Sequence, residues 1–235
     1  MAITASTIIG KVEYDLNDTA NDRWAEAEHL ANLNEAQRMI VALKPDAYTV
    51  NDSYQLAASE TKQRIPDGSA TYQNASAETL KAGVAFIDAV RNMGTSGTSA
   101  GAAVDVVEKN VMDSLDPDWH TATASETVET VVFDRRDPKV FYVYPPQVAA
   151  TMGYLQIVYS ALPDNVAAVG NNIVLDDIYE LPIMEYMKYR AYAKNSHYSA
   201  HAENMRRFHW NQFVNMLGRK ELAENYTEPP ESKVQ

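Results

Sequence analysis

The amino-acid sequence predicts an α+β fold: a helical bundle formed by the N- and C-terminal helices, a β-rich region inserted between them, and an extended C-terminal tail. Apolar residues recur every three or four positions before residue 44 and again between residues 176 and 217, which indicates amphipathic helices. Between these segments, short runs rich in Val and aromatic residues alternate with Gly and Pro, which is typical of strands and turns. Because each helix has one apolar face, the two helical ends of the chain are expected to pack together.

The N-terminal part, residues 1–47, contains two predicted helices. The first covers residues 4–16 and carries Ile8 and Val12 on one side. The second covers residues 24–43, again with apolar residues at helical spacing. It is expected to end at Lys44, because the residue before a proline disfavours helical backbone angles.

The C-terminal part, residues 171–218, is predicted to be a helical hairpin. Asp176 suits a helix N-terminus as a cap, and Pro182 fits the first turn that follows. Asn195-Ser196 is the expected corner between the two helices, and Gly218 is the expected C-terminal stop. The side chains expected to form the bundle core are Leu30, Ile40, Leu181, Tyr189, Met205 and Phe213.

The insertion, residues 48–170, is predicted to consist of short strands. A hairpin turn is expected at residues 134–138, and Pro145-Pro146 is expected to end the strand that follows it. After the hairpin helices, residues 219–235 contain few apolar side chains and are expected to form an extended tail. The predicted strands cover residues 55–58, 62–65, 84–90, 104–111, 128–133, 140–144 and 154–161.

Composition narrows the classes of function. The formal net charge is −12, which argues against a general nucleic-acid-binding protein, because such proteins use Lys and Arg to replace phosphate counterions. The absence of Cys removes disulfides, thiolate metal sites and Cys nucleophiles. No apolar run has the length of a membrane span, and the first residues do not have a signal-peptide pattern, so no membrane partner is expected.

Two sequence patterns resemble metal sites but lack a required ligand. His197 and His201 are four residues apart, as on one face of a helix, yet zinc needs at least a third protein ligand. Residues 15–26 have the acidic spacing of a calcium loop, but Ala20 stands where that loop needs Gly. No metal or cofactor is therefore expected.

Two further patterns lack the context that catalysis needs. Residues 91–101 are rich in Gly and hydroxyl groups, but no Lys-Ser or Lys-Thr follows to form a phosphate-binding loop. Asp134 and Asp137 belong to an exposed turn, where nothing tunes two carboxylates into an acid and a base. The chain is therefore not expected to be an enzyme.

An ordered set of sequence strings resembles the adaptor proteins of tailed bacteriophages, the head-to-tail connector subunits of short-tailed phages. The resemblance runs from about residue 5 to residue 217, fits residues 70–82 poorly and does not include the tail. The strings that carry it are residues 33–41, 44–47, 91–94, 116–120, 133–146 and 179–194.

The resemblance implies a structural virion protein that forms a homo-oligomeric ring, usually twelve-fold, below the portal protein. It implies that the helical bundle forms the ring wall, that the insertion faces a tail or nozzle protein, and that double-stranded DNA passes through the ring. The net charge of −12 predicts that this DNA passes without tight binding. It also implies a place in the virion neck, with assembly in the host cytoplasm. The tail would contact the portal through Arg219, Lys220, Leu222, Tyr226, Pro229, Pro230 and Val234.

Three alternatives remain open from the sequence. The nearest is a tail tubular or gatekeeper protein of the same connector, which also combines helices with β structure. The second is a phage-associated hydrolase with an unrecognised site. The third is a monomeric cytoplasmic binding module, which a measurement of molecular mass distinguishes from a ring.

Overall fold

The computed structural model describes residues 3–194 and 199–227, with side chains described as far as residue 218. The described chain forms two compact units. One contains the described residues up to Lys44 together with those from Pro163 onward, and the other contains residues 45–162. The N- and C-terminal helices therefore share one unit, as the sequence predicts. Residues 163–170, which composition placed in the insertion, belong to the helical unit instead.

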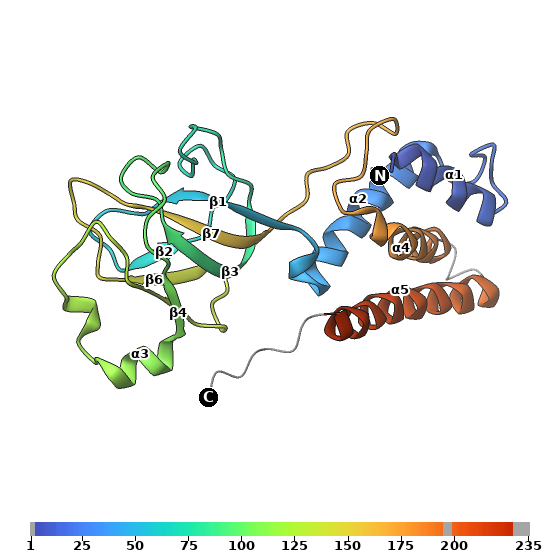
Figure 1. Ribbon diagram of the computed structural model, residues 1–235. Helices are drawn as coiled ribbons and strands as arrows, with labels where there is room; N and C mark the ends of the chain where they lie inside the picture. The colour runs from blue at the N-terminus through green and yellow to red at the C-terminus, as the bar shows by residue number, and fades with distance from the viewer. Residues whose placement is uncertain (1–2, 195–198, 228–235) are drawn as a thin grey trace. The chain divides into compact units, whose positions relative to one another are not determined.

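The helical unit is built around its penultimate helix. Its helices are α1 (Ala5–Asp15), α2 (Glu26–Leu43), α4 (Glu180–Ala193) and α5 (Ala200–Thr227), with a short 3-10 turn η3 (Asp177–Tyr179) before α4. Helix α4 packs against α1, α2 and α5, and it lies between α5 and the α1–α2 pair (Figure 1). The central position of α4 explains why seven of its 14 residues are buried.

Local sequence accounts for several helix ends. The Thr4 hydroxyl accepts a hydrogen bond from the backbone N–H of Thr7 and caps α1. Lys44 leaves the helical conformation directly before Pro45, which ends α2 as predicted. The Asp176 carboxylate accepts a hydrogen bond from the N–H of Ile178 and caps η3, so α4 itself begins at Glu180.

Two predictions for the helical hairpin are wrong, and a third falls on residues that the structure does not describe. The side chain of Leu181 is 60% exposed, because α4 turns Ile183, Tyr186 and Met187 toward the core instead. Gly218 does not end α5, which continues to Thr227, so the tail is not extended over residues 219–227. The corner expected at residues 195–196 lies outside the described residues.

The β unit contains two sheets. The first is fully antiparallel, with strand order β1-β7-β3, and consists of β1 (Thr49–Gln55), β7 (Tyr154–Ala161) and β3 (Gly83–Asn92). The second has the order β2-β6-β5-β4 and consists of β2 (Lys62–Arg64), β6 (Val140–Tyr144), β5 (Thr130–Phe133) and β4 (Asp105–Glu108). Strands β5 and β6 form the predicted antiparallel hairpin, whereas β4 and β5 are parallel. The unit also contains η1 (Pro45–Ala47), α3 (Lys109–Leu115) and η2 (Trp119–Thr121).

Two predicted strands of the insertion are corrected. The strand expected at residues 55–58 covers Thr49–Gln55, because these residues pair along β7 from Ser160 to Tyr154. The strand expected at residues 104–111 ends at Glu108, and α3 begins directly after it. Met112 of α3 then packs with Trp119 and Val132 on one face of the second sheet.

The main core of the β unit combines side chains from both sheets. Phe86 of β3 stacks on Phe141 of β6, with ring centroids 4.9 Å apart. Leu155 and Ile157 of β7 are fully buried in the same cluster. Because each sheet contributes one apolar face, burial of these faces together stabilises the unit.

Candidate assembly surfaces

A polar network joins three helices inside the helical unit. The Nδ1 of His209 on α5 lies 2.7 Å from Oε2 of Glu185 on α4. The ammonium of Lys188 lies 2.5 Å from the other Glu185 oxygen and 3.1 Å from Oδ2 of Asp15 on α1. Burial raises the pKa of Glu185, but its bonds to His209 and Lys188 outweigh burial and hold that pKa below its usual value.

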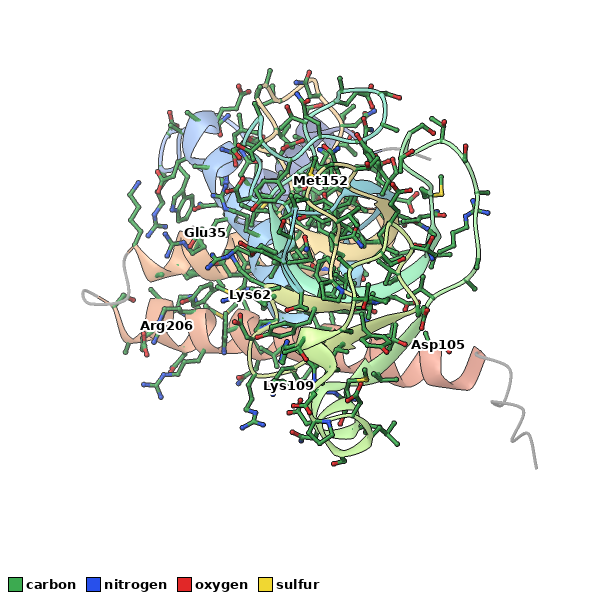
Figure 2. The ribbon with its side chains drawn as sticks, turned by 90° about the vertical axis from the view of Figure 1, so that its left-hand side faces the viewer. Glu35, Lys62, Asp105, Lys109, Met152 and Arg206 are labelled. Atoms are coloured by element: carbon green, nitrogen blue, oxygen red, sulfur yellow. The ribbon has the colours of Figure 1, made fainter. Side chains whose placement is uncertain are left out.

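A second carboxylate joins α2 to α4. Glu35 accepts a hydrogen bond from the hydroxyl of Tyr186 at 3.0 Å, and its other oxygen lies 3.0 Å from Nε of Arg190. Burial, followed by the contact with Glu35, raises the pKa of Tyr186. Glu35 is labelled in Figure 2. The helices are therefore fixed to one another by directed polar contacts as well as by apolar packing.

Two amide side chains of α2 form hydrogen bonds with the backbone of the segment that follows the β unit. Asn34 donates to the carbonyl of Val166 and accepts from its N–H, at 3.1 and 2.7 Å. Gln37 accepts from the N–H groups of Val174 and Leu175 at 2.8 and 3.2 Å. Sequence reasoning did not identify Asn34 or Gln37, because their partners lie more than a hundred residues away.

The segment that resembles a calcium loop is a capped turn. The Asp18 carboxylate accepts hydrogen bonds from the backbone N–H groups of Asp22, Arg23 and Trp24. Trp24 is buried, and its indole N–H donates to the carbonyl of Ala191 at 3.2 Å. Asp18 therefore organises the entry into α2, and Asp15, the first residue of the calcium-like pattern, contacts Lys188.

Only one histidine of the zinc pattern lies among the described residues. His201 is exposed, His209 is bonded to Glu185, and His197 lies outside the described residues. Across residues 3–194 and 199–227, no three His, Asp or Glu side chains are grouped so that they could hold a metal ion.

A shallow groove lies on the outer side of α1. Its volume is ≈ 540 Å³, and Met184 of α4 is part of its lining. We name it the α1 groove; it is lined by Ser6, Thr7, Gly10, Lys11, Tyr14, Asp15 and Met184. Lys11 forms an ion pair with Glu180, the residue before the exposed Leu181. Tyr14 is 79% exposed, so the groove adjoins apolar surface that the helical unit does not cover.

A second exposed surface lies on α5, on the side away from α4. We name it the α5 stripe; it consists of Arg207, Phe208, Asn211, Val214, Asn215 and Gly218, all of which are exposed. Two neighbouring guanidinium groups, those of Arg206 (Figure 2) and Arg207, share the single carboxylate of Glu203. This end of the stripe therefore carries one positive charge in excess.

The β unit offers two hollows of its own. One, of ≈ 550 Å³, lies beside the stacked rings of Tyr54 and Tyr72 and is bordered by Lys62 and Arg64. The other, of ≈ 140 Å³, lies at the turn after β5 and includes Asp134. Backbone and guanidinium contacts with Arg136 lower the pKa of Asp134, as expected for an exposed turn rather than for a general acid.

The residues predicted for the bundle core differ in burial. Ile40 and Phe213 are fully buried, Leu30, Tyr189 and Met205 are half-buried, and Leu181 is exposed. The rings of Tyr186 and Trp210 pack on Phe213, with centroids 5.2 and 5.6 Å away.

The residues predicted to bind the portal lie at or beyond the end of α5. The helix includes Arg219, Lys220, Leu222 and Tyr226, whose side chains are outside the description. Pro229, Pro230 and Val234 lie outside the described residues. Their role in binding a portal therefore stays a prediction.

Comparison with known proteins identifies the family. No helix in the described part of the chain is both long and apolar enough to cross a membrane. No curated protein matches the chain. A family model described as SU10 adaptor protein matches residues 3–232, which includes both units. The chain therefore belongs to the SU10 adaptor protein family of phage structural proteins.

Proposed function

We propose that this phage adaptor forms a ring below the portal, joins the DNA-filled head to the tail and lines the channel through which the DNA passes. The observation that carries the proposal is the family match over residues 3–232, which spans the helical unit and the β unit alike. In this proposal the helical unit forms the ring wall, α5 and the residues after it reach the portal, and the β unit contacts a tail or nozzle protein. The ring is twelve-fold, it occupies the virion neck, and it assembles in the host cytoplasm.

The chemistry of the described residues supports a structural role rather than catalysis. The ionisable groups Glu185, Lys188 and His209 connect helices inside the bundle, and Glu185 is bonded to the other two. The protein is therefore proposed to act by binding its neighbours, with no cofactor.

The net charge of −12 supports a channel through which DNA moves freely. A ring of acidic subunits concentrates negative charge, and a channel wall with that charge does not hold phosphates tightly. DNA can then move through the ring in either direction.

Imaging tests the proposal directly. The purified chain is mixed with portal protein and examined by negative-stain electron microscopy, with its mass measured separately by light scattering. We expect a ring attached to one end of the portal and a mass that is a multiple of 26.2 kDa. A chain that stays at 26.2 kDa and does not attach to the portal contradicts the proposal.

A further inference from the structure

His29 on α2 is a buried histidine that no hydrogen bond holds. Its side chain is 0% exposed, within the core of the helical unit. Both ring nitrogens are buried, and neither has a hydrogen-bond partner in the part of the chain that the structure describes. Buried polar atoms are bonded in the great majority of cases, and an unbonded one lowers the stability of the fold. An apolar side chain would therefore suit this position better for packing alone, so the imidazole indicates a further role.

Charged groups from three helices and a turn act on the ring of His29. They are Glu13 of α1, Glu28 of α2, Asp18 of the turn between these helices, and Lys194 directly after α4. The Asp18 carboxylate already accepts bonds from three backbone N–H groups, and Glu28 lies 2.7 Å from Nζ of Lys194. Glu13 acts most strongly of the four and has no ion-pair partner among the described residues. Glu13 is therefore the carboxylate left to receive a protonated imidazole.

Proton uptake by His29 favours an opened helical unit. Burial lowers the pKa of His29, and this effect outweighs the nearby carboxylates, which raise it. In an opened chain the same imidazole is solvated and has its ordinary pKa of about 6.5. The opened state therefore binds a proton more readily than the closed state, so the stability of the closed state is greatest above about pH 6.5. That stability falls as pH falls from there through the lowered pKa of the closed state.

We propose that His29 is an acid-sensitive switch of the helical unit: proton uptake moves its ring out of the core toward Glu13 and separates α1 from α2. In the closed state the neutral ring is packed between the helices. In the acid state the imidazolium reaches the carboxylate of Glu13, and α1 shifts because Glu13 belongs to that helix. A buried histidine whose charge changes near neutral pH is a known basis for such switches. The inference does not depend on the proposed ring, because it concerns each copy by itself.

Urea unfolding at a series of pH values, followed by the circular dichroism of the helices, tests the switch. One proton bound on opening raises the unfolding equilibrium constant by up to tenfold for each pH unit below about 6.5. Carboxyl groups titrate near pH 4 and do not contribute this effect. We expect His29→Leu and His29→Phe to lose this part of the pH dependence. A folded variant with the same dependence as wild type between about pH 6.5 and 5 overturns the inference.

Nuclear magnetic resonance titration of the imidazole gives a test that keeps His29 in place. We expect the pKa of His29 in the folded chain to lie below about 6.5. Glu13→Gln removes the carboxylate that raises this pKa most, so the pKa is expected to fall further. Glu26→Gln, at an exposed position of α2, is the matched control and should leave it unchanged. A pKa at or above about 6.5, or equal effects of the two substitutions, overturns the inference.

Hydrogen exchange measured by mass spectrometry locates the opening. The amides of α1 are expected to exchange faster in wild type than in His29→Leu, by a larger factor at about pH 5 than at about pH 7.5. The amides of β7, in the β unit, should exchange alike in the two proteins at both pH values. An unchanged factor for α1, or an equal change in β7, overturns the opening of α1. Comparison of the two proteins at one pH removes the direct effect of pH on exchange.

Discussion

The carboxylate of Glu185 on α4 lies 2.7 Å from the imidazole of His209 on α5, and its second oxygen contacts Lys188. The side chains of Glu185 and Lys188 are only 12% and 11% exposed, so loss of one charge leaves the other in a poorly solvated place. The polar contact of α4 with α5, and through Lys188 that with α1, therefore depends on the charge of a single carboxyl group.

Glu185→Gln is expected to lower the free energy of unfolding by roughly 3 kcal/mol at neutral pH, as for other broken buried pairs. Because the folded pKa of Glu185 is lowered, its contribution is present above the unfolded value of about 4.3 and is lost as pH falls through the folded pKa. Urea unfolding followed by circular dichroism should therefore show the stabilities of wild type and variant drawing together as pH falls below about 4.3. Glu28→Gln, at the more exposed pair with Lys194, is the control and should cost less than about 1 kcal/mol.

Phe213→Ala should destabilise the helical unit far more than Leu181→Ala. Phe213 is fully buried between Tyr186 and Trp210, and truncation of such a side chain costs about 3–5 kcal/mol. Leu181 is 60% exposed, so its truncation should cost less than about 1 kcal/mol. Chemical denaturation of both variants measures the difference, and equal costs would show that the core is misplaced. The same experiment on Lys139→Ala, at an exposed position of the β unit, should also show a small effect.

Gln37→Leu removes the acceptor for two backbone N–H groups, those of Val174 and Leu175. Each buried donor left without a partner costs about 1–3 kcal/mol. We expect faster hydrogen exchange at residues 174 and 175 than in wild type, measured by mass spectrometry. Gln55→Leu, an exposed position on β1, is the matched control and should leave this exchange unchanged.

Deletion of residues 219–235 should leave the fold intact and abolish attachment to portal-bearing heads. Leu217, which is 6% exposed, precedes the deletion, so the described core is retained. Thermal unfolding checks the first expectation, and co-sedimentation with heads checks the second. Attachment that persists after deletion would remove the proposed portal contact from this segment.

The isolated protein should show no measurable binding to duplex DNA at physiological salt. Its net charge of −12 supplies no counterion release from phosphates. A gel-shift titration at two salt concentrations measures this, and any weak association should vanish at the higher one. Tight, salt-resistant binding would contradict a passive channel and favour a DNA-processing role.

The fold class and most elements could be predicted because they depend on local patterns. The strand Tyr154–Ala161 follows from its run of apolar residues, and the turn before β6 follows from Asp137-Pro138. The buried face of α4 could not be predicted, because that helix is contacted from three sides and apolar residues occur around most of it. Likewise, Gly218 lies within α5 although Gly usually favours a helix end.

The candidate surfaces were harder to predict than the core. The α5 stripe contains Asn and Arg as well as Phe208, so its sequence is that of an ordinary solvated helix face. The hydrogen bonds of Asn34 and Gln37 are made with backbone groups that only folding brings close to them. Polar residues whose partners are distant in sequence leave no periodic signal, which is why pattern reasoning missed them.

The first and last strands of the β unit are neighbours, since Thr49 of β1 pairs with Ser160 of β7. Paired residues in an antiparallel sheet lie about 5 Å apart, so the chain leaves the helical unit and re-enters it through almost the same place. The β unit is thus an inserted domain whose two ends lie side by side. Another domain of different shape, or a short linker, can replace the β unit without a change in the backbone of the helical unit.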